Sequence, residues 1–189
     1  MKYDVVIRCK NEMEWLPRVL NSINNQSLQP TKIILVDNSS TDGSLDYAEQ
    51  FGCTVLKYDK SEFNYSYALN LGINATTEEE VLILSAHCEL VTDESVLNMI
   101  EVRHAYKAAG VFGRQIPTVH SNPIDTRDLV TVFGRERIVF ESYPFFHNAF
   151  SFFKKSTLEN FPFDEVYGSK EDRYWALDVV ENKPTLGAL

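Results

Sequence analysis

The feature that most constrains the fold of this chain is a regular alternation of short apolar runs with helix-like segments through its first half. The apolar runs are rich in Val, Ile and Leu, and such runs are typical of buried strands. Because helices separate them, the pattern predicts βαβ units and an α/β fold with a doubly wound, mostly parallel sheet flanked by helices. The predicted strands are Tyr3–Arg8, Lys32–Asp37, Cys53–Tyr58, Val81–Ser85 and Gly110–Gln115.

Four segments between these strands have helical character. In the first of them, four apolar side chains recur at the spacing of one helical face. The predicted helices are Glu14–Gln26, Ser44–Phe51, Ser66–Ala75 and Asp93–Ala109.

The second half of the chain has a different pattern. Ile116–Phe146 contains three prolines and no helical period, so we predict loops with one or two strands there. Asn148–Phe161 predicts a strand that runs into a short helix, and a last helix is expected to begin near Lys170. No internal repeat or linker is visible, and we expect residues 1–189 to form a single domain.

Charge and cysteine content limit the classes of function. The net charge of −9 argues against binding of nucleic acid or of an anionic membrane through bulk charge. No signal peptide is visible, and no apolar stretch approaches the roughly 20 residues that span a bilayer. Cys9, Cys53 and Cys88 are odd in number and widely spaced, which favours reduced thiols. We therefore predict a cytoplasmic protein, with peripheral attachment to the membrane as an alternative.

Polar residues follow three of the predicted strands. In open α/β sheets, ligands bind at the carboxyl ends of the strands, so we expect these three clusters to meet at one edge. The clusters are Arg8, Lys10 and Asn11; Asp37 and Ser39; and Ser85 and His87.

Asp37 is the strongest binding candidate among them. A carboxylate at a strand end can accept hydrogen bonds from the imide N–H of a pyrimidine or from ribose hydroxyls, and we expect it to lie outside the core. Arg8 and Lys10 would suit a diphosphate, or alternatively form a salt bridge to Asp37 or Asp4. The following Thr41–Ser44 is most simply a turn with a helix cap.

Two further candidates have competing interpretations. His87 stands beside Cys88, but no second Cys/His pair lies at zinc-finger spacing, so a single metal ligand is favoured over a zinc site. Glu171 and Asp172 begin the last predicted helix, where acids favour the helix dipole. The alternative is that one of them is a general base that removes a proton from a hydroxyl.

Taken together, these motifs resemble the family 2 glycosyltransferases, which are inverting enzymes of the GT-A fold. The resemblance covers roughly Tyr3 to Ala176 and rests on five segments in the order VVIRCKNE, IILVDNSSTDGS, FNYSYALNLGINA, VLILSAHCEL and GSKEDRYWA. It implies a GT-A (nucleotide-diphospho-sugar transferase) fold with a Rossmann-like sheet.

The resemblance also implies a binding site for a nucleotide-diphosphate sugar. Asp37 matches the acid that contacts the nucleobase, and Arg8 to Asn11 match the first nucleotide-binding loop. Ser85-Ala86-His87 falls where the family usually has Asp-x-Asp. We therefore expect Ser85 to face the ribose and His87 to ligate Mn²⁺ or Mg²⁺.

The implied activity is sugar transfer with inversion. Asp172 matches the catalytic base, with Glu171 as the next candidate, and Asn148–Ser156 matches the segment that lines the donor sugar and acceptor pocket. The acceptor would be a glycan, a lipid-linked molecule or a small molecule, in polysaccharide or glycoconjugate synthesis.

Two other functions remain alternatives at this stage. A nucleotidyltransferase would need a glycine-rich basic loop after the first strand, and RCKNEMEW contains no glycine. The change to Ser-Ala-His and the short stretch after Asp172 leave open a non-catalytic protein that binds a sugar nucleotide or a glycan.

Overall fold

The structure is a computed structural model that describes residues 1–119, 121–134, 136, 138–140 and 144–182. Its strands are β1 (Tyr3–Cys9), β2 (Lys32–Asp37), β3 (Thr54–Lys57), β4 (Glu80–Ser85), β5 (Gly110–Phe112) and β6 (Phe150–Lys154). Its helices are α1 (Leu16–Asn24), α2 (Ser44–Phe51), α3 (Tyr65–Asn74), α4 (Ser95–Tyr106), α5 (Pro123–Val132), α6 (Lys155–Asn160) and α7 (Glu171–Asn182), with a 3-10 turn η1 (Lys60–Glu62).

The strands form one mostly parallel sheet in the order β3-β2-β1-β4-β6-β5. Strand β1 pairs in parallel with β2 and β4, and β2 pairs in parallel with β3. Strand β6 runs antiparallel to both β4 and β5. The predicted α/β class and mostly parallel sheet are therefore confirmed, and the antiparallel β6 is a feature that the sequence pattern did not specify.

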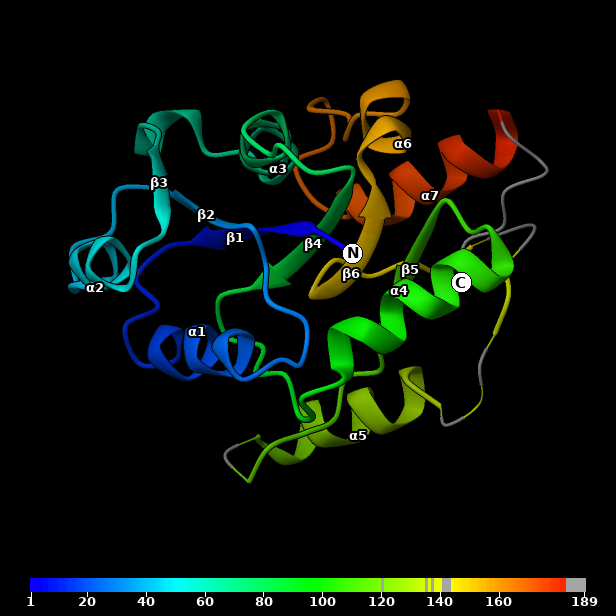
Figure 1. The fold of residues 1–189 in the computed structure, drawn as a ribbon, viewed down its shortest axis with the longest axis horizontal. Coiled ribbons are helices and arrows are strands. Elements are labelled where there is room, and N and C mark those ends of the chain that lie inside the picture. Colours follow the sequence, from blue (N-terminus) through cyan, green and yellow to red (C-terminus); the bar gives the residue numbers. More distant parts are fainter. Residues whose placement is uncertain (120, 135, 137, 141–143, 183–189) are drawn as a thin grey trace.

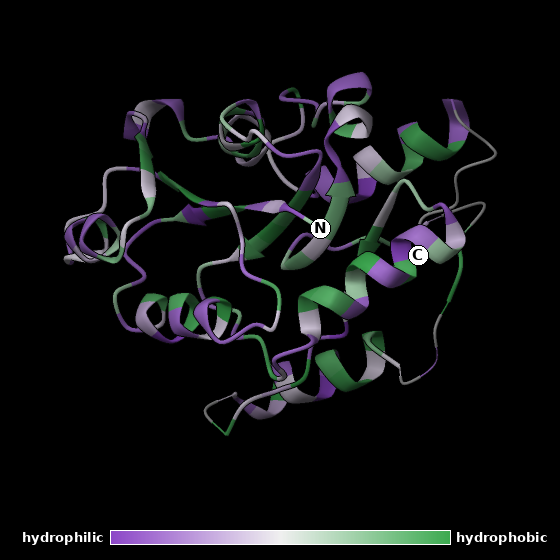
Figure 2. Ribbon diagram, viewed as in Figure 1, coloured by the Kyte–Doolittle hydropathy of each residue, from purple (hydrophilic) through white to green (hydrophobic). Residues whose placement is uncertain are grey.

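Helices cover both faces of this sheet (Figure 1). Helices α1, α2 and α4 contribute to the hydrophobic core on one face, and α3, α6 and α7 contribute to the core on the other. The alternation of side chains along β1 separates the cores, because Val5 and Ile7 belong to the first and Val6 to the second. In Figure 2 the central strands are mainly green, as expected for strands buried on both faces.

The predicted elements of the first half agree closely with the structure. The bounds of β2 and α2 are those expected, and the last helix, α7, begins next to Lys170. The predicted strand and short helix of Asn148–Phe161 are β6 and α6.

The prediction for Ile116–Phe146 was wrong in part, because this stretch contains helix α5. Asn122 caps the helix by accepting hydrogen bonds from the N–H groups of Ile124 and Asp125, and Pro123 occupies the first turn. Helix α5 buries none of its side chains, so it has no apolar stripe from which the helix could be predicted. Residues 120, 135, 137 and 141–143 of this stretch lie outside the described residues.

The cysteines and the helices also bear on the expected reduced thiols and on membrane spans. Cys9, Cys53 and Cys88 are all free thiols, as predicted. Burial raises the pKa of each to about 11. In the described part of the chain, no helix is long and apolar enough to cross a bilayer.

Helix α3 packs unusually close to the sheet at Gly72. A Cβ atom at this position would overlap Val6 Cγ1 and would lie 3.0 Å from Val36 Cγ2. We expect Gly72→Ala to lower the free energy of unfolding by about 1–2 kcal/mol, because overpacking outweighs the better helix propensity of alanine. Urea denaturation measures this, and Gly134→Ala is the control because its Cβ would meet nothing within 4 Å. An unchanged midpoint for Gly72→Ala would show that α3 shifts without cost.

Candidate active site

The three polar clusters predicted at strand ends meet at one edge of the sheet. Cys9 pairs with Asp37 across β1 and β2, and Arg8 pairs with Ser85 across β1 and β4. The next strand in the sheet, β6, joins the same edge because the N–H of Ser85 donates to the carbonyl of Ala149 at 2.9 Å. Candidate residues from distant parts of the sequence therefore lie on neighbouring strands.

Lys10 links the turn after β1 to the turn after β2. Its ammonium donates to the carbonyl oxygens of Asn38 and, at 2.7 Å, of Ser39. Ser39 has a φ of 55°, a left-handed conformation that is uncommon for serine. The lysine thus holds a strained turn beside Asp37, and its ammonium is bound by neutral carbonyl groups.

Asn11 ties the same two turns together through its backbone and its side chain. Its N–H donates to Ser40 Oγ at 2.9 Å, and its Oδ1 accepts from the N–H of Thr41 at 2.8 Å. Asn11 itself has a φ of 55°, which asparagine tolerates better than most residues. These bonds use the Asn11 side chain to fix the geometry of the loop.

The segment Thr41–Ser44, which we interpreted as a turn, also binds this loop. Asp42 Oδ1 accepts from the N–H of Ser44 at 3.0 Å, and Asp42 Oδ2 accepts from the N–H of Met13 at 2.9 Å. The hydroxyl of Ser44 accepts from the N–H of Glu12 at 2.9 Å. The turn interpretation fits these contacts, with the added effect of holding the loop after β1.

Asp37 is almost fully buried, with 1% of its surface exposed, which differs from the position outside the core that we expected. The turn after β2 folds over it, and its Oδ2 accepts from the N–H of Ser40 at 2.9 Å. Its Oδ1 is also buried, and it has no hydrogen-bond partner among the described residues. Such an atom is costly unless it is satisfied, so Oδ1 is a suitable acceptor for a donor group of a ligand.

Arg8 is paired with neither of the acids proposed for it. Its guanidinium lies 3.1 Å from Glu171 Oε1 and 4.7 Å above the ring of Tyr65. Asp4, at the other end of β1, instead accepts from the N–H groups of residues 77 and 78. The ion pair is mostly buried, since the side chains of Arg8 and Glu171 are 22% and 8% exposed. It fastens the start of α7 to the end of β1.

Asp172 follows directly and is held differently from Glu171. Its Oδ1 accepts from the N–H of Arg173 at 2.8 Å, and its Oδ2 accepts from the N–H of Asn148 at 3.2 Å. Lys170, with a φ of 63°, turns the chain sharply just before these acids. Asp172 is half-buried and forms no ion pair within the described part of the chain. Of the two predicted acids, Asp172 is therefore the one available to a substrate.

His87 lies exposed at the end of β4 and contacts a residue that we did not predict. Its Nδ1 is 3.2 Å from Glu12 Oε1. When Nδ1 carries the proton for this bond, Nε2 presents its lone pair, which is the arrangement of many metal-binding histidines. Glu12 stands beside the predicted Lys10 and Asn11, but its contact with His87, 75 residues away in sequence, has no signal in the sequence pattern.

The structure gives little support for a metal site built from protein side chains alone. Among the described residues, no three His, Cys, Asp or Glu side chains are grouped to hold a metal. Burial keeps the Cys88 thiol protonated, with a pKa of about 11, so it is a poor ligand. The zinc alternative gains no support. At His87 the described residues bring together one imidazole and one carboxylate, Glu12, which is fewer protein ligands than a structural zinc site has.

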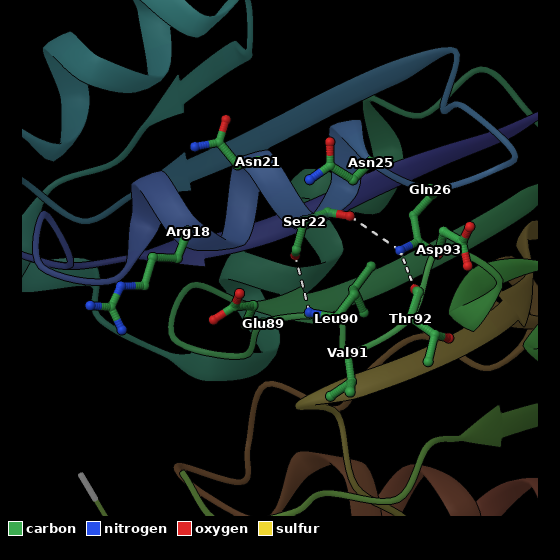
Figure 3. A pocket seen from close by; sticks show the side chains of 10 residues that line it. All are labelled: Arg18, Asn21, Ser22, Asn25, Gln26, Glu89, Leu90, Val91, Thr92 and Asp93. Carbon is green, nitrogen blue, oxygen red and sulfur yellow. Dashed lines mark hydrogen bonds between the residues drawn. The ribbon is translucent and has the colours of Figure 1, made fainter. Parts of the chain in front are cut away.

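A cavity of about 410 Å³ lies beside this edge, between α1 and residues 89–93 (Figure 3). Two of its polar side chains join its walls: Ser22 Oγ accepts from the N–H of Leu90, and Gln26 Nε2 donates to the carbonyl of Thr92. None of the predicted site residues lines it. We interpret these bonds as the attachment of the segment after His87 to α1.

A family model and a curated relative both relate this chain to glycosyltransferases. A family model described as glycosyl transferase family 2 matches residues 4–161. The O-antigen chain rhamnosyltransferase RfbN of Salmonella typhimurium is 24% identical over 193 residues, which cover 96% of this chain and 62% of that protein. The chain therefore spans less than two thirds of the length of this relative.

Two solved structures share the fold. The crystal structure of S. aureus TarS matches 100% of this chain and 35% of its own, with a TM-score of 0.75 and 16% identity. The mannosyltransferase PcManGT from Pyrobaculum calidifontis, in complex with GDP-Man and Mn²⁺, matches 94% of this chain and 51% of its own, with a TM-score of 0.69 and 21% identity.

The pair of Arg8 and Glu171 should contribute measurably to stability. We expect a double-mutant cycle of Arg8→Leu and Glu171→Leu to give a coupling energy of about 1–3 kcal/mol. Each single change leaves the mostly buried charge of the other residue without its partner. Urea denaturation of the four proteins measures it. The exposed pair of Lys57 and Glu49, at 3.2 Å, is the control and should show almost no coupling. A similar value for both pairs would contradict the role given to the buried pair.

Proposed function

We propose that this chain, which belongs to glycosyl transferase family 2, moves a sugar from a nucleotide-diphosphate donor to an acceptor hydroxyl with inversion at the anomeric carbon. The observation that carries the proposal is the meeting of two different acids at one edge of the sheet. Asp37 is buried with an unsatisfied oxygen, and Asp172 is half-buried and outside any described ion pair. A binding acid and a reacting acid are the two functions that such a transfer needs.

The turns after β1 and β2 would form the nucleotide site. Oδ1 of Asp37 would accept an N–H of the base or a ribose hydroxyl, as in the role that its position matches in the family. Ser39, held by Lys10, and Ser85, at the end of β4, would lie near the ribose. Because Lys10 and Asn11 already brace the turns, their main contribution would be to fix the site, with the charge of Lys10 attracting the diphosphate.

Asp172 would act as the base. Its carboxylate accepts the proton of the acceptor hydroxyl while the acceptor oxygen bonds to the anomeric carbon. The bond between that carbon and the diphosphate oxygen breaks, and the nucleoside diphosphate departs with the electron pair. Glu171, bound to Arg8, would position the first turn of α7 instead of reacting itself.

His87 would supply one ligand to Mn²⁺ or Mg²⁺ bound to the donor diphosphate, with Glu12 orienting its ring. The metal would supply positive charge to the leaving diphosphate. In this proposal, Ser-Ala-His is a variant of the Asp-x-Asp motif in which one imidazole replaces the carboxylate ligand.

The relatives suggest a class of substrate. RfbN is named as an O-antigen chain rhamnosyltransferase, and PcManGT is bound to GDP-Man. We infer transfer of a hexose or deoxyhexose in polysaccharide or glycoconjugate synthesis, to a glycan, lipid-linked or small-molecule acceptor. The single domain of residues 1–189 would carry both the donor site and the base.

Substitutions of Asp172 and of Asp37 should affect different quantities, turnover in the first case and nucleotide binding in the second. Asp172→Asn should lower turnover by about 10²–10⁴-fold and leave nucleoside diphosphate binding unchanged, because a base acts in the transition state. Asp37→Asn should weaken that binding. Release of nucleoside diphosphate from a panel of sugar nucleotides, together with titration calorimetry, measures both effects.

The control for these variants is Asp178→Asn, which changes an exposed acid two turns further along α7. Near-normal turnover of Asp172→Asn would remove the assigned base. A wild-type protein that binds sugar nucleotides but releases no diphosphate would favour the non-catalytic alternative.

The proposed metal ligand can be tested by binding alone. Mn²⁺ should strengthen nucleoside diphosphate binding by the wild type, and His87→Ala should abolish most of this gain. His87→Asp should retain a gain and shift preference towards Mg²⁺, which favours oxygen ligands. His104→Ala is the matched control, because His104 contacts Glu80 at 2.8 Å at the opposite edge of the sheet. If chelator leaves wild-type binding unchanged, His87 is not a metal ligand.

A further inference from the structure

His147 is a half-buried histidine that the proposed mechanism does not use. It lies three residues before β6, and the rings of Phe133 and Phe145 lie 5.7 and 6.4 Å from it, centroid to centroid. The side chain of Gln115, in the segment after β5, reaches its Nδ1 at 2.9 Å. Three separate parts of the chain therefore hold the ring.

The contacts at Nδ1 determine which tautomer is present. The backbone N–H of Ala149 points to Nδ1 at 3.2 Å, and a backbone N–H can only donate a hydrogen bond. Nδ1 must therefore be an acceptor, and the Gln115 amide is a second donor to it. The neutral ring then carries its proton on Nε2, and no described residue is hydrogen-bonded to that atom.

The surroundings keep this ring neutral. Burial lowers the pKa of His147 below its ordinary value of 6.5. Asp172 and Glu171, from α7, act in the opposite direction, whereas Arg173 of α7 and Arg8 of β1 reinforce the effect of burial. At neutral pH the side chain is thus a fixed N–H donor without charge.

The backbone beside His147 connects it to the reacting acid. The next residue, Asn148, donates its N–H to Asp172 Oδ2, and the carbonyl of Ala149 accepts from the N–H of Ser85. His147 belongs to the β6–β5 half of the sheet, whereas Asp37 ends β2 in the other half. The histidine therefore lies beyond Ser85, on the side of the proposed nucleotide site opposite Asp37.

We propose that the Nε2–H of His147 donates a hydrogen bond to a hydroxyl oxygen of the saccharide that reacts at Asp172, and so forms a specificity subsite. A neutral donor on an aromatic wall suits a sugar, which is uncharged and has both hydroxyl groups and apolar C–H faces. Its blocked Nδ1 and protonated Nε2 make it unsuited to act as a base or to ligate a metal. This inference rests on the proposed sugar transfer. The hydroxyl belongs either to the transferred sugar or to the acceptor.

The tautomer can be tested without any substrate. NMR spectra of protein labelled with ¹⁵N in histidine should show one ring with a bare Nδ1 and a protonated Nε2, and this signal should be missing from His147→Phe. Protonation of Nδ1 in that ring would overturn the proposal.

The subsite is tested with His147→Phe, which keeps an aromatic ring and removes the donor, and His147→Gln, which keeps a side-chain N–H. Donor probes are UDP-glucose, UDP-N-acetylglucosamine, GDP-mannose and dTDP-rhamnose, and acceptor probes are octyl glycosides of the same types of sugar. His104→Phe is the matched control at the opposite edge. Binding of free nucleoside diphosphate, which lacks the sugar, should be unchanged in every variant and reports that the protein is folded.

The two sources of the hydroxyl give different results. If it belongs to the transferred sugar, His147→Phe should weaken binding of the sugar nucleotide by about 3- to 10-fold, with partial rescue in His147→Gln. If it belongs to the acceptor, sugar-nucleotide binding should be unchanged and the acceptor KM should rise by a similar factor. If His147→Phe changes neither the affinity for the sugar nucleotide nor the acceptor KM, the subsite is overturned and the proposed function remains intact. A wild type that binds no sugar nucleotide would overturn both.

Discussion

The structure depends on one constraint: β1 is enclosed on every side. It is hydrogen-bonded in parallel to β2 and β4, and its side chains enter the cores on both faces of the sheet. The middle of a strand in this position, Val5 to Ile7, has no place for polar chemistry, so the charged residues of β1 lie towards its ends, Asp4 at the start and Arg8 at the carboxyl end. Because β2 and β4 run in the same direction, their polar ends meet it there. The site is thus a consequence of the pairing, and the loops only complete it.

The loops at this edge are fixed by bonds between turns, and some of the backbone there is in an uncommon conformation. Of the four described residues other than glycine with positive φ, three lie at the site: Asn11, Ser39 and Lys170. Such residues cost free energy and persist only where neighbouring contacts hold them. Lys10 and Asn11 provide these contacts between the first two turns, and the pair of Arg8 and Glu171 does so for the start of α7. The edge is therefore largely organised before any ligand binds.

The sequence was sufficient to predict those parts of the fold in which buried apolar residues follow one another or recur at a regular spacing. The bounds of β2 follow from a run of apolar residues, and the presence of α1, though not its ends, follows from its buried stripe. Helix α5 could not be predicted in this way, because it buries no side chain. The positions of the candidate residues followed from strand order, but their partners did not. Arg8 pairs with Glu171 across 163 residues, and this contact depends on where α7 returns to the sheet.

The same reasoning explains why His147 and Glu12 were not predicted. Glu12 follows β1, but its contact with His87 depends on how two distant loops meet. His147 precedes the antiparallel β6, whose start lies at the active edge only because its direction is reversed. A pattern that assigns ligands to the carboxyl ends of strands cannot identify a residue that enters the edge from the amino end of a strand. Its environment also depends on Gln115 and Phe133, which are brought together by the pairing of β5 with β6 and by the path of the chain between them.

The charges at this edge explain how an acidic protein could accept a diphosphate. Asp37, Glu171, Asp172 and Glu12 already place carboxylates there; among the described residues Glu171 is paired with Arg8, and Glu12 contacts His87. Two more carboxylates in place of Ser85 and His87 would repel an anionic ligand unless a metal ion compensated them. Lys10 is bound by carbonyl groups, which do not cancel its charge, so its ammonium still attracts an anion. Under the proposed function, a serine and an imidazole in place of two carboxylates would reduce the positive charge that a metal must supply, and the ammonium of Lys10 would reduce it further.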